Sequence, residues 1–229
     1  MGRREITLGR QHSAAPARSR FRLPALVLVL GIMAAPAATM AATLTVTGGP
    51  GLDQGQLCVT GNLCPGTPAF SLIGAAPVIG SFTYNSGPNT VDFSLTLAAN
   101  ANFGAVSLLA GSTFTATGVP VIALPFGPGI QVVQVGAANG LASPLLISPA
   151  LPILANTPVI SGLTCSIGTG ADQCGVSLGA GGLQISDGAG GSYDTFATFN
   201  VNVVPVPAAV WLFGSALGLM GVLRRRATV

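Results

Sequence analysis

The sequence contains no lysine, and its nine arginines all lie before residue 23 or after residue 223. Between Thr43 and Val203 it also lacks arginine, histidine and glutamate, so five aspartates are the only charged side chains of this stretch. The formal charge of this central part is therefore −5, although the whole chain carries +3. A nucleic-acid partner is excluded, because binding to phosphates requires a cationic surface that these residues cannot form.

The same absences bear on catalysis. General acid–base chemistry near neutral pH usually relies on histidine, glutamate or lysine, and the sole histidine, His12, precedes the central part. Serine and cysteine nucleophiles are present, but no base is available there for the usual catalytic triads. We therefore predict that the protein is not an enzyme and that it needs no cofactor.

The N-terminal residues 1–42 have the composition of a secretory signal peptide. Six arginines precede the apolar run 23–35, and small residues continue to the end of the segment. The cleavage sites that these small residues allow follow Ala37, Ala41 or Ala42. We favour one of the later two, because Thr43 begins a strand-like pattern, and we expect export across the inner membrane.

The C-terminal residues 204–229 combine a proline-rich link, an apolar run and three arginines at positions 224–226. No side chain from Ala208 to Leu223 is charged. Roughly 16 helical residues span about 24 Å, somewhat less than the ~30 Å hydrocarbon core of a bilayer. The segment thus predicts a marginal transmembrane helix whose basic end stays in the cytosol, with the central part outside.

This tail resembles a known sorting signal. The residues that carry the resemblance are Val204, Pro205, Val206, Pro207 and Ala208, the apolar run that follows, and the stop residues Arg224, Arg225 and Arg226. Together they resemble the PEP-CTERM signal in its VPLPA variant, with Val206 where that variant usually has leucine. The resemblance implies a surface or secreted protein of a Gram-negative bacterium, recognised by a membrane-embedded exosortase and associated with extracellular polysaccharide or biofilm matrix.

Residues 43–203 predict a single all-β domain, either a sandwich or a barrel. Apolar residues occur in short runs that glycine or proline interrupts about every eight to twelve residues. The clearest pair is 80–84 with 90–97, where apolar and polar residues alternate and 85–89 supplies a turn. Further predicted strands are 43–47, 56–60, 69–73, 105–110, 112–117, 130–135, 145–148, 157–166, 175–178, 182–186 and 193–203. The six prolines within 118–152 are badly placed for central strands, so parts of this segment should be edge strands or loops.

Four cysteines in an exported chain predict two disulfides. Three pairings are formally open. Short spacing across turn residues favours the local one, Cys58 with Cys64 and Cys165 with Cys174.

One segment suggests a ligand. Asp187 and Asp194 flank a glycine-rich stretch, as carboxylates do in some calcium sites, but this unit occurs once and has too few ligands for calcium. A hairpin turn between strands 183–186 and 193–202 is the simpler interpretation, and the two aspartates remain weak metal candidates.

Two functions are consistent with these features. The first is a structural or matrix-associated surface protein, sorted by an exosortase through its tail and related to extracellular polysaccharide. The second is a lectin-like or adhesive binding module that uses a loop for a glycan, with or without calcium. The scarcity of aromatic side chains in the central part favours the first.

Overall fold

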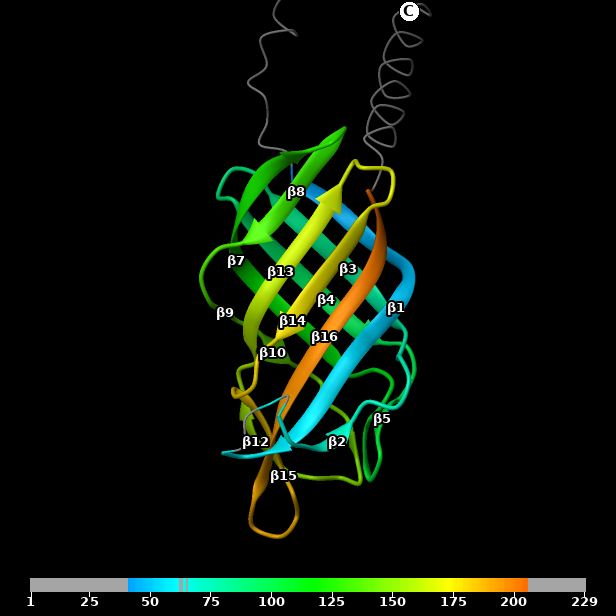
Figure 1. Ribbon diagram of the computed structural model, residues 1–229, viewed down its shortest axis with the longest axis vertical. Coiled ribbons are helices and arrows are strands. Elements are labelled where there is room, and N and C mark those ends of the chain that lie inside the picture. Colours follow the sequence, from blue (N-terminus) through cyan, green and yellow to red (C-terminus); the bar gives the residue numbers. More distant parts are fainter. Residues whose placement is uncertain (1–40, 62–63, 65, 206–229) are drawn as a thin grey trace, which may run out of the picture. The chain divides into compact units, whose positions relative to one another are not determined.

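The computed structural model describes residues 41–61, 64 and 66–205 of the chain (Figure 1). All regular elements within these residues are β-strands, which confirms the predicted all-β class. No helix long and apolar enough to cross a bilayer occurs in this described part. The predicted signal peptide up to residue 40, the tail helix, Val206, Pro207, Ala208 and the three arginines at 224–226 lie outside it.

Eight antiparallel strands close into a barrel (Figure 1). Around the ring they follow the order β1, β3, β4, β7, β8, β13, β14, β16, and the ring closes because β16 also pairs with β1, from Leu44 opposite Pro205 to Val59 opposite Tyr193. Of the two architectures left open by the sequence, the barrel is therefore the one formed. The ring strands are β1 (Ala41–Val59), β3 (Val78–Asn85), β4 (Thr90–Leu97), β7 (Thr113–Phe126), β8 (Gly129–Gln134), β13 (Val159–Ile167), β14 (Gln173–Leu178) and β16 (Ser192–Pro205).

Shorter strands extend the barrel at its edges and cross one of its ends. A separate three-stranded sheet places the buried Phe103 against Gly55, where a Cβ would come within 2.8 Å of the ring. Phe103 belongs to the same cluster of buried side chains as the inward-facing residues of the barrel strands. The three-stranded sheet therefore covers the barrel interior at the end near Gly55. The shorter strands are β2 (Pro68–Ser71), β9 (Ala138–Asn139), β10 (Leu141–Ala142), β12 (Ile153–Asn156) and β15 (Leu183–Ser186), with β5 (Ala101–Phe103), β6 (Val106–Leu108) and β11 (Ile147–Ser148) in the separate sheet.

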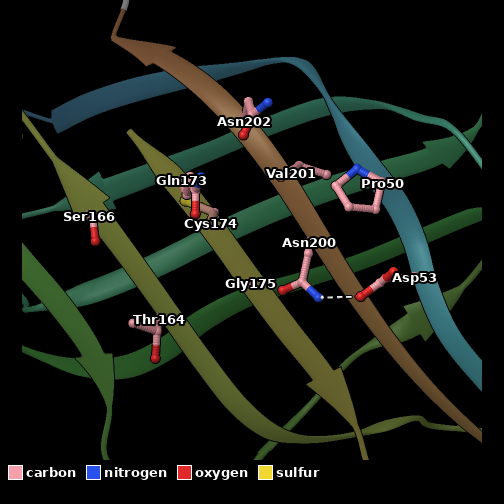
Figure 2. Close-up of a pocket in the computed structure, with 10 residues that line it drawn as sticks. All are labelled: Pro50, Asp53, Thr164, Ser166, Gln173, Cys174, Gly175, Asn200, Val201 and Asn202. Atoms are coloured by element: carbon pink, nitrogen blue, oxygen red, sulfur yellow. Dashed lines mark hydrogen bonds between the residues drawn. The ribbon is translucent and has the colours of Figure 1, made fainter. Parts of the chain in front are cut away.

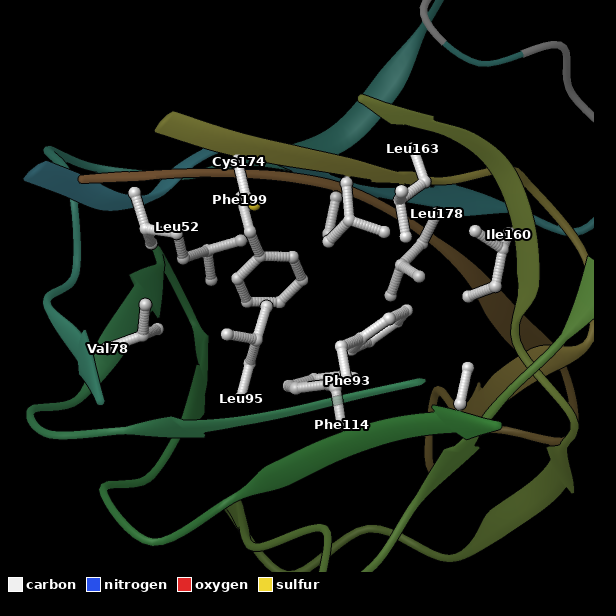
Figure 3. Close-up of a cluster of buried hydrophobic side chains, with 14 of the residues drawn as sticks. Leu52, Val78, Phe93, Leu95, Phe114, Ile160, Leu163, Cys174, Leu178 and Phe199 are labelled. Atoms are coloured by element: carbon white, nitrogen blue, oxygen red, sulfur yellow. The ribbon is translucent and has the colours of Figure 1, made fainter. Parts of the chain in front are cut away.

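The interior of the barrel is filled by side chains (Figure 3). Alternating residues of β4 point inward, as their sequence pattern predicts: Val91, Phe93, Leu95 and Leu97 are buried, and the residues between them are partly exposed. Phe114 and Phe199 meet inside with ring centroids 5.2 Å apart. An eight-stranded ring is just wide enough for its side chains to fill, so the packed interior leaves the outer wall as the place for a ligand site.

Two of the predicted strands form a single strand. The segments 43–47 and 56–60 are parts of one strand, β1, which continues between them through three irregularities of register. Glycines at the irregular positions let the backbone bulge and bend without losing its pairing with β16. Sequence patterns that assume regular alternation miss such a continuous strand.

The prediction that parts of 118–152 are edge or loop structure agrees with residues 135–152, which form loops and two-residue strands, whereas β7 continues to Phe126 as a strand of the ring between β4 and β8. Pro120 lies where pairing with β8 ends, opposite Val135, whose N–H donates to the Pro120 carbonyl over 2.8 Å. Pro125 lies beyond the last pair with β4, where β7 has a partner on one side only. Both prolines therefore avoid positions flanked by strands on both sides, where proline is excluded.

Both disulfides have the local connectivity. Cys165 and Cys174 face each other on β13 and β14 with Cα atoms 4.1 Å apart, and both are buried in the core. Cys58 is buried near the end of β1 and is bonded to Cys64 in the loop that follows. The first bridge thus joins two barrel strands from within, whereas the second fixes a loop to the wall.

Candidate functional site

A polar groove lies on the outer wall where β13, β14, β16 and β1 run side by side (Figure 2). Alternate residues of these strands fill the core and the intervening ones face outward. In the groove, the outward side chains of β13, β14 and β16 carry amides and hydroxyls instead of charges. The groove has a volume of about 430 Å³. We call it the wall groove; its lining residues are Pro50, Asp53, Thr164, Ser166, Gln173, Cys174, Gly175, Asn200, Val201 and Asn202.

The irregular part of β1 forms one side of the wall groove. Register shifts around Gly48, Gly51 and Leu52 displace the strand locally, and Pro50 and Asp53 border the groove as a result. Gly51 is buried with φ +82°, and a Cβ there would lie 2.2 Å from the carbonyl oxygen of Ala76. Only glycine fits this bend, so the sequence of the bulge determines the position of Asp53.

Asn200 lies in the middle of the groove (Figure 2). Its Nδ2 donates a hydrogen bond to Asp53 Oδ2 over 3.1 Å, which links β16 to the bulge of β1. The neighbouring residue on β14, Gly175, has no side chain, and a Cβ there would come within 3.0 Å of Asn200 Oδ1. Gly175 therefore leaves the space in which the Asn200 amide lies.

A second hollow of about 300 Å³ meets the wall groove at Asp53. We call it the side hollow; it is lined by Asp53, Gln54, Gly55, Gln56, Ser71, Leu72 and Phe196. Phe196 pairs with Gln56 across β16 and β1 and is partly exposed, so its ring is available to a ligand. Gln56 Oε1 is buried and has no hydrogen-bond partner among the described residues. The side hollow thus adds a partly exposed aromatic ring beside the polar groove, whereas the Gln56 Oε1 atom is enclosed by the protein.

The two hollows together present hydrogen-bond donors and acceptors with little charge. Asparagine and glutamine amides both donate and accept, serine and threonine hydroxyls do the same, and Asp53 is the one charged residue that lines either hollow. Such a lining suits a neutral ligand rich in hydroxyl groups. It does not suit a polyanion, because no lining residue is cationic and Asp53 repels negative charge.

The weak metal candidates Asp187 and Asp194 do not face one another. Asp187 lies in the turn between β15 and β16, where its Oδ1 accepts hydrogen bonds from the N–H groups of Ala189 and Gly191, both over 2.8 Å. Asp194 lies within β16, opposite Cys58 and Gln184, and its Oδ1 is buried without a partner in the described part of the chain. The segment between them forms the predicted hairpin turn.

The sorting motif is described only at its first two residues. Val204 and Pro205 are the last residues of β16 and pair with Thr45 and Leu44 of β1. The domain therefore extends two residues into the predicted tail, and the link to the apolar run begins at the barrel wall.

Sequence reasoning did not identify the groove. Its residues come from four strands, of which β1 is distant from the other three in the sequence, and only the strand pairing and its register bring them together. One signal was present, since the alternation in β16 already places Asn200 and Asn202 on the face opposite the core. The position of Asp53 depends on the bulge in β1, which no alternation rule anticipates.

Comparison with protein-family models, curated proteins and solved structures finds no match to this chain.

Proposed function

We propose that the protein is an exported surface protein of a Gram-negative bacterium, sorted by an exosortase through its tail, which associates with extracellular polysaccharide through the wall groove. The observation that carries the proposal is the lining of that groove, in which amides and hydroxyls surround a single carboxylate. Sugars offer the complementary hydroxyl groups. The resemblance of the tail to a PEP-CTERM signal supports the sorting step, and the two disulfides are consistent with an oxidising compartment outside the cytoplasm.

A polymer fits this site better than a small molecule does. The wall groove and the side hollow meet at Asp53 and are open on the barrel surface, so successive sugar units can lie along the seam of β1 and β16. Phe196 offers a hydrophobic ring to a sugar face, while the Asn200 amide offers hydrogen bonds. Binding without chemistry is proposed, because the groove lacks a nucleophile paired with a base among its lining residues.

A binding assay with three polysaccharide conditions tests the proposal. The mature full-length chain in mild detergent is titrated with dextran as a neutral polymer, with alginate as a polyanion, and with dextran in the presence of calcium or of a chelator. We expect saturable binding to dextran and none to alginate. Asn200→Ala should weaken binding about tenfold, as expected for the loss of one or two hydrogen bonds worth ~1 kcal/mol each.

Asn139→Ala is the matched control, because Asn139 is an exposed asparagine on β9 that lines neither hollow. If neither polymer binds saturably, or if both variants bind equally well, the groove is not a polysaccharide site. Binding that requires calcium would instead support the calcium-dependent lectin-like module.

A further inference from the structure

The hairpin that joins β7 to β8 ends in a continuous apolar tip. Residues 122–128 are all exposed, and their sequence contains no polar side chain: Ile122, Ala123, Leu124, Pro125, Phe126, Gly127 and Pro128. Half of the Phe126 surface is accessible. Isolated exposed apolar residues are ordinary, whereas a continuous patch of them usually marks an interaction surface.

The tip projects from the barrel (Figure 1). The last pair of β7 with β4 is Pro120 with Thr90, and from there β7 continues to Phe126 with only β8 as partner. At about 3.4 Å per residue this extension is roughly 20 Å long. From Ile122 onward β7 has no second strand partner among the described residues, so this edge of the hairpin is exposed, whereas β8 pairs with β13 as far as Ile130 opposite Ile167.

The tip lies at the end of the barrel where the chain continues towards the tail. At this end Ala41 pairs with Asn85, and Val203 donates its N–H to the Asp172 carbonyl, in the loop between β13 and β14. The start of the same loop lies against the hairpin of β7 and β8. Gly129 of this hairpin is so close to the end of β13 that a Cβ on it would come within 2.0 Å of the Ile167 carbonyl oxygen. We call this the exit end.

We propose that the apolar tip inserts into the interfacial layer of the membrane that holds the tail, so that the barrel docks against the bilayer surface before it is released. The inference rests on the proposed function, since it requires the tail to lie in the membrane. The apolar run begins at Ala209, four residues after Pro205, and four extended residues reach about 14 Å. This short link holds the exit end, and with it the hairpin tip at the same end of the barrel, close to the bilayer.

The absence of cations on the body specifies the kind of contact. Between Asp92 and Asp172 the sequence has no charged residue, and Asp172 at the exit end accepts a hydrogen bond from the Thr169 N–H over 2.9 Å. Attraction to anionic headgroups is therefore unavailable, and burial of the tip must drive the contact. Docking should thus occur on zwitterionic lipid and should not weaken at high salt.

Tryptophan quenching in vesicles tests the proposal, because the chain has a single tryptophan, Trp211, in the tail. The full chain is reconstituted in phosphatidylcholine vesicles with or without brominated acyl chains. Quenching of Trp211 in the unchanged protein reports tail insertion. In a Trp211→Phe background, the tryptophan of the Phe126→Trp variant reports whether the tip enters the lipid, and the Leu154→Trp variant is the matched control. Leu154 is equally exposed but lies on β12, which pairs through β15 with the opposite end of β16.

We expect brominated lipid to quench Trp211 and Phe126→Trp, and to leave Leu154→Trp unaffected, at low and at high salt. Leu124→Trp gives an independent measurement on the same tip should Phe126→Trp fail to fold. Quenching of Trp211 without quenching at either tip position would overturn the docking inference while leaving the sorting tail intact. If the fluorescence emission of the tip tryptophan is blue-shifted but not quenched by brominated lipid, the docking inference is overturned in favour of contact between two copies of the chain. An unquenched Trp211 would overturn the docking inference together with the membrane tail of the proposed function, and would leave the wall groove as a polysaccharide site.

Discussion

Replacing Phe199 by alanine tests whether the barrel interior is a packed core. Phe199 is fully buried, lies in the middle of β16 and packs against Phe114 with centroids 5.2 Å apart. Its truncation removes a large buried side chain and leaves a cavity, a change that typically costs about 3–5 kcal/mol. For a domain of this size each kcal/mol lowers the melting temperature by roughly 2–4 °C, so the expected decrease is about 6–20 °C.

The assay is urea and thermal unfolding of the mature chain in mild detergent, followed by far-ultraviolet circular dichroism with disulfides intact. Phe126→Ala is the matched control, because it makes the same chemical change at a half-exposed position of the hairpin tip, where we expect a cost of at most about 0.5 kcal/mol. Equal costs at the two positions would refute the packed interior. Adding Phe114→Ala completes a double-mutant cycle, in which we expect the two rings to be coupled by about 0.5–1.5 kcal/mol.

Three further predictions concern the bridges, the bulge and the tail. Replacing Cys165 and Cys174 together by alanine should cost roughly 2–3 kcal/mol by the chain-entropy estimate, measured by urea titration, and no change in midpoint would contradict the bridge. Gly51→Ala should destabilise the domain by at least about 1–3 kcal/mol, because its positive φ and a carbonyl oxygen 2.2 Å from the added Cβ oppose any side chain; wild-type stability would disprove the described bulge. Replacing Pro205 and Pro207 by alanine should leave export intact but block processing, which the intact mass of protein from cells and medium would reveal; unchanged release would exclude the sorting role.

The sequence predicted the parts of the fold that depend on local alternation. The pair β3 and β4 follows from the regular pattern of residues 90–97, and β16 follows from the same pattern ending at Val203. It also favoured the local disulfides, since short spacing restricts the geometry. Local patterns contain this information because neighbouring residues alone decide which face is buried.

Closure of the ring and the position of the groove could not be predicted in this way. Both depend on which strands pair and in what register, and those pairs join distant segments such as Leu44 and Pro205. The bulge at Gly51 changes the register within one strand, so a single irregularity determines where Asp53 lies. Composition did limit the chemistry of the site, because a body without cations can form only neutral or acidic surfaces.

The pairing of β1 with β16 also determines when folding can finish. These strands are the first and the last of the described domain, so β1 has one unpaired edge until the C-terminal strand is available. A chain that crosses a membrane from its N-terminus cannot complete the ring before β16 has emerged, and such distant pairing is intrinsically slow. During this interval the open edge can pair with other chains. If the chain is exported as proposed, its open edge therefore stays unprotected until the last strand arrives, immediately ahead of the tail.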